Sequence, residues 1–241
     1  MQHEQVRARH LVSVGPAARA LAAGLRSGEL GVLADEAKRR FRSDWLHYGL
    51  SRDLDQPFEA PNAKFDLTIR PLRSSDVPKL LDMHSTEMAP RGPYVRMHRL
   101  RFLREGIGTC WVAARADDDE PCYMQWLIPA TDDARVQSYF DGIFPHLEPG
   151  DALLEYAFTP ERFQGQGIMA AAMARIAERA ADLPARRVIT FVDHTNIPAL
   201  KGCHRSGFAE YVRRIDQWRA FRRTPRFEPL PSGFAGSIPA R

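Results

Sequence analysis

Cysteine is scarce in this chain, and long hydrophobic runs are missing. The three cysteines (Cys110, Cys122 and Cys203) are widely and irregularly spaced, which supports neither a disulfide framework nor a zinc site. No apolar run approaches the roughly 18 to 20 residues that span a bilayer. The first residues are polar and lack a continuous hydrophobic core followed by a cleavage site. We therefore expect a cytoplasmic protein with no membrane span and no metal.

Positive charge is in small excess, because 34 Lys and Arg residues against 30 Asp and Glu residues give a net charge of +4. The arginines crowd only in segment 213–226, and such a basic stretch is usually a solvated surface. Nucleic-acid binding is therefore disfavoured, and an anionic cofactor or partner is an equally good use of the charge. The composition, 44% hydrophobic and 27% charged, is that of an ordinary globular protein.

The pattern along the chain predicts three parts. Apolar residues at helical spacing over 17–50, followed by a linker with Pro57 and Pro61, indicate a helical amino-terminal extension over residues 1–64. Residues 65–218 carry regular alternation and form the predicted main domain. Residues 219–241 are predicted to be a basic tail. The extension is expected to pack as a lid or as a dimer element, because its apolar stripe needs covering.

The main domain alternates strand and helix patterns. Strands are expected at 65–72, 109–115, 122–128, 152–158, 186–193 and 211–218, and helices after Ser74 or Ser75 and at 94–105, 167–181 and 197–206. The acidic turn 117–121 joins two of the strands as a hairpin. An order that mixes a hairpin with a crossover predicts an α/β (α+β) fold, a mixed sheet with helices on both faces.

The segment after the fourth strand has the pattern of an anion site. Gly165 and Gly167 lie in a turn directly before a helix, so backbone N–H groups and the helix dipole can approach a pyrophosphate. A plain strand-to-helix turn is the alternative. A Walker loop is excluded because no Gly-Lys-Ser/Thr follows, and a dinucleotide fold is disfavoured because the third glycine is missing.

A second segment narrows the interpretation. It contains Asn196, and Ala199 in the first turn of a helix. At the end of that helix, Gly207 can adopt a left-handed conformation and Phe208 can fold back on the core. Together the two segments resemble the GNAT acetyltransferase superfamily, whose cofactor motif Q/R-x-x-G-x-G/A matches residues 164–169 and whose N-x-x-A…G-F signature matches the second segment. The resemblance covers roughly residues 65–218 and implies a mostly antiparallel mixed sheet.

The resemblance also implies a reaction and its cosubstrate. Acetyl-CoA or another acyl-CoA would donate an acyl group to an amine by direct attack on the thioester, with the pyrophosphate held by the glycine turn. The pantetheine would lie along the fourth strand, where the sheet splays. The residues so assigned to the cofactor are Tyr156, Ala157, Phe158, Gln164, Gly165, Gln166, Gly167, Ile168, Met169 and Asn196.

The chain departs from the family pattern at two positions. Met169 replaces the last Gly or Ala of the motif, and Cys203 stands where the family often has a tyrosine that serves as general acid. Three roles are open for Cys203: it fills a small apolar space, it donates or relays a proton, or it acts as a nucleophile. Glu155 is the candidate general base. Alternatively, its carboxylate is satisfied on the outer face of the sheet and has no catalytic role. The other ionisable neighbours are His194, His204 and Tyr211.

Acceptor contacts are expected from the helices after the first strand and from the loop before the fourth. Candidates there are Arg91, Tyr94, Arg96, His98 and Asp141. The acceptor itself is a small-molecule or peptide amine. Two other functions stay open: a non-catalytic CoA-binding sensor or scaffold, and an acyltransferase whose donor is an acyl carrier protein. A homodimer is a further possible assembly.

Overall fold

The computed structural model describes residues 37–81 and 92–238 of the chain, and the chain divides into two compact units. The smaller unit comprises Met1–Asp44 and Gln217–Arg223, where the Arg219 guanidinium lies 2.8 Å from a carboxylate oxygen of Asp44. The larger unit comprises Trp45–Asp216 and Thr224–Arg241. The cavity and the candidate site residues discussed below lie in the larger unit.

Eight strands of the described residues form one sheet in the order β2-β3-β4-β5-β6-β1-β7-β8. The pairs β1–β6, β2–β3, β3–β4 and β4–β5 are antiparallel, whereas β5 and β6 are parallel. The mixed, mostly antiparallel sheet expected from the sequence is thereby confirmed. The strands are β1 (Arg42–Asp53), β2 (Leu67–Pro71), β3 (Thr109–Arg115), β4 (Pro121–Pro129), β5 (Asp151–Phe158), β6 (Arg187–Asp193), β7 (Ala209–Arg219) and β8 (Arg222–Pro229).

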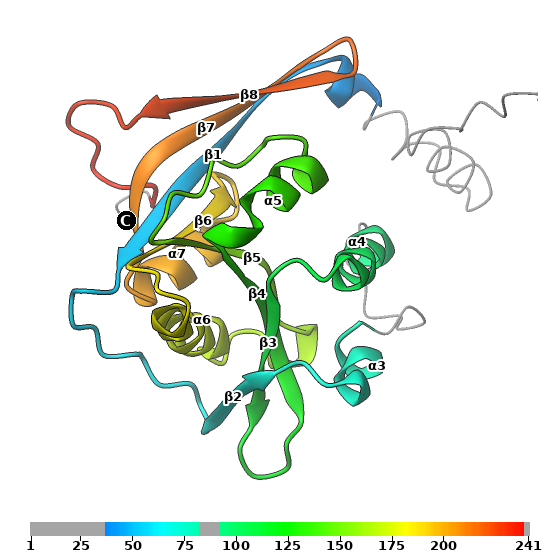
Figure 1. Cartoon of the computed structure of the whole chain (residues 1–241), viewed down its shortest axis with the longest axis vertical. Helices are drawn as coiled ribbons and strands as arrows, with labels where there is room; N and C mark the ends of the chain where they lie inside the picture. Colours follow the sequence, from blue (N-terminus) through cyan, green and yellow to red (C-terminus); the bar gives the residue numbers. More distant parts are fainter. Residues whose placement is uncertain (1–36, 82–91, 239–241) are drawn as a thin grey trace, which may run out of the picture. The chain divides into compact units, whose positions relative to one another are not determined.

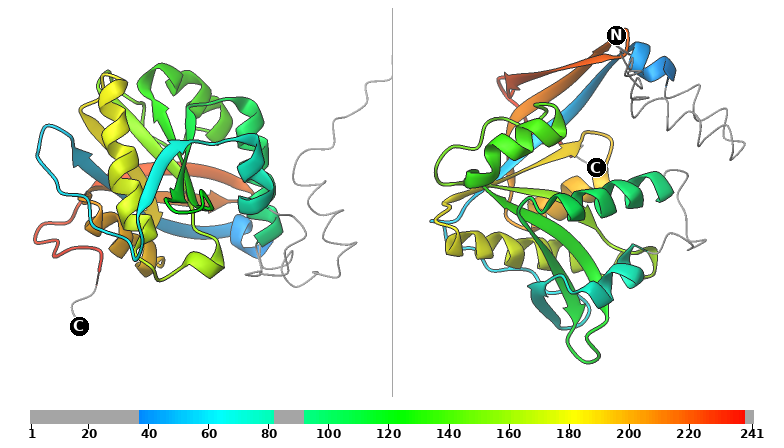
Figure 2. Two further views of the ribbon diagram at one scale, coloured as in Figure 1. Left: turned by 90° about the horizontal axis from the view of Figure 1, so that it is seen from below. Right: turned by 45° about the vertical axis from the view of Figure 1, so that its right-hand side comes forward.

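Helices cover both faces of this sheet, and α6 and α4 lie on opposite sides of it (Figures 1 and 2). Helix α7 lies on the same face of the sheet as α6, and helices α3 and α5 lie on the same face as α4. Short 3₁₀ turns precede several of these helices. The helices are α3 (Val77–Leu80), α4 (Gly92–Glu105), α5 (Asp133–Phe140), α6 (Ile168–Glu178) and α7 (Ile197–Arg205).

The core consists of two apolar clusters, one on each face, and strand alternation divides β5 between them. Leu154 packs with Met173 of α6, whereas its neighbour Leu153 packs with Phe102 of α4 and the aromatic residues around it. Because β5 is buried on both faces, it reads as the near-continuous apolar run 152–154. Its polar residue, Glu155, comes directly after that run.

The helical pattern predicted up to residue 50 is wrong for residues 42–50, which form most of β1. Within the predicted helical segment 17–50, the described residues are helical only at 37–41, and residues 1–36 lie outside the described part. β1 pairs with β6 from His47↔Asp193 to Asp53↔Arg187 and buries Leu50 completely. Long-range pairing therefore overrides the local helical spacing. The alternation of Leu46, Tyr48 and Leu50 was the signal that favoured a strand.

Two further elements lie where the sequence pattern showed none. α5 occupies the loop between β4 and β5, and β8 lies within the segment expected to be a basic tail. In α5 the Asp133 carboxylate accepts hydrogen bonds from Gln137 Nε2 and Leu147 N, both at 2.9 Å, which connect the helix to the loop behind it. β8 is an edge strand with mostly exposed side chains, so it lacks the apolar alternation that identifies strands.

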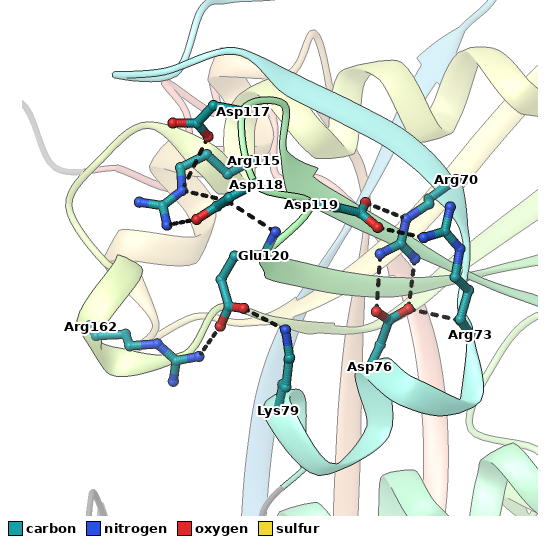
Figure 3. Close-up of polar contacts among 10 residues, drawn as sticks. All are labelled: Arg70, Arg73, Asp76, Lys79, Arg115, Asp117, Asp118, Asp119, Glu120 and Arg162. Carbon is teal, nitrogen blue, oxygen red and sulfur yellow. Dashed lines mark hydrogen bonds and ion pairs between the residues drawn. The ribbon is translucent and has the colours of Figure 1, made fainter.

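The acidic turn of the β3–β4 hairpin links three segments of the larger unit (Figure 3). The buried Arg70 of β2 makes two hydrogen bonds, of 2.6 and 3.0 Å, to the Asp76 carboxylate. At the end of the turn, Glu120 accepts hydrogen bonds from Lys79 at 2.7 Å and from Arg162 at 3.1 Å. Arg162 lies three residues before Gly165 of the glycine turn, so this network connects that turn to the hairpin.

Candidate active site

A cavity of about 670 Å³ lies where α6 and α7 meet β4, β5 and β6. Most of the residues that the sequence assigned to the cofactor line it together. The assigned residues on its wall are Ala157, Phe158, Gln164, Gly165, Gly167, Ile168, Met169 and Asn196, and Cys203 lies beside them. Gln166, Tyr156 and Glu155 are not on this wall. The cofactor assignment itself stays a prediction.

A gap between β5 and β6 forms one part of the cavity. The two strands pair only from Asp151↔Arg187 to Leu153↔Ile189, and after these three residue pairs they separate. The cavity wall then comes from Ala157 and Phe158 on one strand and from Thr190 and Val192 on the other. The splay expected from the resemblance is therefore present at this point of the sheet.

A bulge in β5 lies beside the gap. Tyr156 has φ of +58°, a left-handed conformation that is unusual for a residue with a side chain. The β4–β5 register shifts at the same place, because Trp126 pairs with Glu155 whereas Met124 pairs with Phe158. As a result Tyr156 packs on the α4 face, among Phe102 and Trp126, whereas its neighbour Ala157 lines the cavity.

The glycine turn joins β5 to α6. Gly165 and Gly167 have φ of +72° and +77°, which glycine adopts without strain. A Cβ at Gly165 would meet nothing within 4 Å, whereas one at Gly167 would lie 3.3 Å from the Asn62 carbonyl oxygen. The first hydrogen bond of α6 runs from the Ala171 N–H to the Gly167 oxygen, at 3.2 Å. The N–H groups of the preceding turn are therefore not used by the helix.

The opposite wall of the cavity is α7. Asn196 caps this helix, since its side-chain oxygen accepts a hydrogen bond of 3.2 Å from the Ala199 N–H. At its other end Gly207 has φ of +86° and Phe208 is buried, as the sequence predicted. Gly202 accommodates the unusual Met169, because a Cβ there would lie 2.8 Å from the Met169 sulfur. The departure from the motif at 169 is thus matched by a glycine on the facing helix.

Glu155 lies on β5, two residues beyond Leu153 of the last β5–β6 pair. It is partly buried, and burial raises the pKa of its carboxyl group to about 7, although the Tyr156 backbone N–H and the cations Arg214 and Arg99 oppose this rise. Arg214 is itself ion-paired, with its Nε 3.2 Å from an Asp216 oxygen. A carboxylate with a pKa near 7 can accept a proton at neutral pH.

Arg99 connects α4 to the bulge. Its guanidinium donates hydrogen bonds to the Ala157 carbonyl oxygen at 3.1 Å and to the Tyr156 carbonyl oxygen at 3.4 Å. It also lies over the Phe158 ring, 4.8 Å from the centroid. Burial lowers the pKa of Arg99 to about 10, while Tyr156 and Glu155 act against this shift. Arg99 therefore stays charged at neutral pH and fixes the backbone of β5 at the bulge.

Cys203 lies on α7 with only 1% of its surface exposed. Its sulfur is 3.8 Å from the Met173 sulfur, and burial raises the pKa of its thiol to about 12. A thiol with so high a pKa forms little thiolate and is a poor proton donor to a departing thiolate. The surroundings of Cys203 favour the packing interpretation over the relay or the nucleophile.

The remaining ionisable candidates lie away from the cavity wall. His194 Nδ1 is 3.0 Å from the Leu46 carbonyl oxygen, and His204 Nε2 is 2.7 Å from a Glu210 oxygen. Burial raises the pKa of Tyr211 to about 12. On the acceptor side, Arg96 and His98 belong to α4 and Asp141 follows α5, whereas Arg91 and the side chain of Tyr94 lie outside the described residues.

Sequence reasoning missed two polar residues of the cavity wall, Tyr123 and Gln125 on β4. Both are almost completely buried, and the Tyr123 hydroxyl donates a hydrogen bond of 2.7 Å to the Gln125 side-chain oxygen. The available signal was a glutamine inside the apolar run 122–128. Among the described residues no cluster of His, Cys, Asp or Glu could hold a metal ion. In the same part of the chain, no helix is both long and apolar enough to span a membrane.

Comparison with known families identifies this arrangement. A family model described as an acetyltransferase (GNAT) domain matches residues 66–209, more than half of the chain. This chain therefore belongs to the GNAT acetyltransferase family, as the resemblance indicated. No curated protein sequence matches it.

Several solved structures are similar to this chain at low sequence identity. A GCN5-related N-acetyltransferase from Sphaerobacter thermophilus is 14% identical over 82% of this chain and 57% of its own, with a TM-score of 0.46. A glucosamine N-acetyltransferase region of a fungal multi-domain GH3 β-N-acetylglucosaminidase is 12% identical over 77% of this chain and 22% of its own, with a TM-score of 0.50. The chain spans 56 to 59% of the length of the first three structures that it resembles.

Proposed function

We propose that this protein is an N-acyltransferase that transfers an acyl group from acyl-CoA, with acetyl-CoA as the donor, to the amine of a small molecule or peptide. One observation carries the proposal. A single cavity extends from the glycine turn and the first turn of α6 to the gap between β5 and β6. An anionic head and an extended thioester arm need these two features side by side.

The residues present suit the two ends of CoA. The unused N–H groups between Gly165 and Ala170, together with the dipole of α6, favour a pyrophosphate. Lys201 and Arg205 on α7 line the same cavity and add positive charge. At the other end, Ala157 and Phe158 offer a strand edge that β6 has left, along which an extended arm can lie.

Glu155 is proposed as the general base. A primary amine is mostly protonated at neutral pH, so it must lose a proton before or during its attack on the thioester carbon. In the proposed step the nitrogen lone pair forms the C–N bond, the C–S bond breaks, and its electron pair goes to sulfur. The proton from nitrogen passes to the Glu155 carboxylate, either directly or through one water molecule.

The test of the cofactor site uses Gly165, because its left-handed backbone tolerates Asp and Asn and a new Cβ meets no atom. Wild-type protein with excess CoA should melt higher than without it. Gly165→Asp places a carboxylate beside the proposed phosphates and should abolish this shift. The matched Gly165→Asn variant has the same shape without charge and should keep most of it. Equal CoA affinity in all three folded proteins would refute the cofactor site.

The donor and the catalytic claim need a second experiment. Thiol release from acetyl-CoA, longer acyl-CoAs and an acyl carrier protein thioester should be measured over a panel of amines. Turnover with acetyl-CoA supports the proposal, and turnover only with the carrier thioester would replace the donor. If CoA binds but no donor and amine combination releases thiol, the chain is a CoA-binding sensor rather than an enzyme.

A further inference from the structure

Tyr123 and Gln125 form a buried polar pair on the cavity wall. Tyr123 has none of its surface exposed and Gln125 only 1%, yet both line the cavity that also holds Cys203. Their hydrogen bond, 2.7 Å from the phenol oxygen to the Gln125 oxygen, is a side-chain contact inside an otherwise apolar strand. Burying two polar side chains is unfavourable unless they are hydrogen-bonded, and this pair meets that condition through its own hydrogen bond.

The strand register places this pair at the bulge. Met124 pairs with Phe158 and Trp126 pairs with Glu155, so Gln125 is the β4 residue opposite the two residues of the bulge, Tyr156 and Ala157. The proposed thioester arm ends beside this bulge. Tyr123 and Gln125 are therefore the polar side chains that β4 contributes to the cavity wall beside the bulge.

The same cavity lacks a hydroxyl on its other wall. The resemblance assigns the proton donor to position 203, where this chain has a short, buried thiol packed against Met173. On the facing strand, Tyr123 lines the same cavity. The cavity wall therefore carries a phenol on β4 and a thiol on α7.

We infer that Tyr123, oriented by Gln125, donates the hydrogen bond that stabilises the departing thiolate, in place of the residue missing at 203. The inference rests on the proposed acyl transfer. When the C–S bond breaks, the electron pair stays on sulfur and the phenol donates its hydrogen bond to it. Tyr123 keeps its proton, the amine proton is on Glu155, and the thiolate takes a proton from solvent when it leaves.

The carboxamide of Gln125 makes this arrangement feasible. It can face the phenol with its oxygen, as in the structure, or after a flip with its NH₂ group. In the second orientation Gln125 donates to the phenol oxygen, and the phenol proton is free to point at sulfur. The ionisable groups that act electrostatically on Tyr123 are Cys203 of α7 and Arg99 of α4. Burial, and then Cys203, raise the pKa of Tyr123 well above 10, so the phenol stays a donor at neutral pH.

The test measures the thiol pKa of bound CoA, which needs no acceptor. The thiolate absorbs in the near ultraviolet, so its fraction is followed from pH 7 upward, with each protein without CoA as its own blank. Tyr123→Phe keeps the ring and removes only the hydroxyl. It should raise the pKa of the bound thiol by about one to two units, the size expected for a hydrogen bond to a charged acceptor. The control variant is Tyr139→Phe, which removes the hydroxyl of a tyrosine on the α4 face and should leave that pKa unchanged.

A second variant changes the charge beside the pair. Gln125→Glu places a negative carboxylate that holds the phenol proton, so it should raise the pKa of the bound thiol at least as much as Tyr123→Phe. An identical thiol pKa in wild type and Tyr123→Phe, with CoA bound to both, would overturn the inference and leave the proposed function intact. Failure of wild-type protein to bind CoA would instead overturn the proposed function, and this inference with it.

Discussion

Replacing Glu155 with glutamine should lower activity and raise stability at the same time. Burial raises the pKa of Glu155 from about 4.5 to about 7, with the Tyr156 N–H, Arg214 and Arg99 opposing the shift. In the unfolded chain the carboxyl ionises near 4.5. The folded state thus holds the proton more tightly, and this stabilising contribution, complete below pH 4.5, is lost as pH rises through 7. A difference of 2.5 units corresponds to about 3 kcal/mol.

The stability assay is urea unfolding at pH 5 and at pH 8. Glutamine is neutral at both pH values, so the variant avoids the ionised buried carboxylate. The free energy of unfolding of Glu155→Gln, relative to that of wild type, should be about 2 to 3 kcal/mol higher at pH 8 than at pH 5. Glu59→Gln, a change at an exposed carboxylate, is the control and should gain almost nothing.

The activity assay is the pH dependence of kcat/KM with the best donor and acceptor found. Wild type should rise with pH and level off above about 7, where Glu155 is ionised. Loss of a general base typically lowers the rate about 10² to 10⁴-fold, and the variant should lose the rise that Glu155 causes. A variant with unchanged kcat/KM, or with the same stability difference at pH 5 and pH 8, would refute the reasoning about this carboxyl group.

Two further predictions concern Cys203 and β1. Cys203→Ala should keep kcat within about threefold of wild type and lose about 1 to 2 kcal/mol of stability, because the thiol is packed and its pKa is about 12. A hundredfold loss of kcat in folded protein would restore a catalytic role. Deletion of residues 1–64 removes β1, which lies between β6 and β7, and should give insoluble protein, because seven residue pairs with β6 are lost. Soluble protein with an unchanged urea midpoint would show that β1 is dispensable.

Features that depend on neighbours along the chain could be predicted from sequence. The strand before Pro160, the glycine turn and the start of α6 form one continuous segment, so their residue types predict their conformation directly. The helix start after Asn196 and the left-handed Gly207 are likewise local, and both occur as expected. The family membership follows from these same segments, because their motifs combine residue type with fixed spacing.

Features that depend on distant partners could not be predicted. Residues 42–50 fit a helical spacing, and only the open edge of β6 decides that they form a strand. The β5 bulge at Tyr156 is equally hidden, since it exists only as a shift against β4. A local sequence pattern shows which residues are apolar. Where that pattern fits both a helix and a strand, the neighbouring strand with which the segment can pair decides between them.

The sequence by itself determined that this chain builds a glycine turn, a helix start and a second motif with an asparagine cap, because these are properties of short contiguous segments. The tertiary structure decided the surroundings of the candidate catalytic side chains. It buried Glu155 so that the pKa of its carboxyl group rises to about 7, and it buried Cys203 so that the pKa of its thiol rises to about 12. It also placed Tyr123 of β4 on the same wall as residues more than thirty positions away. Burial and long-range proximity arise only when the sheet is assembled, and no residue carries them alone.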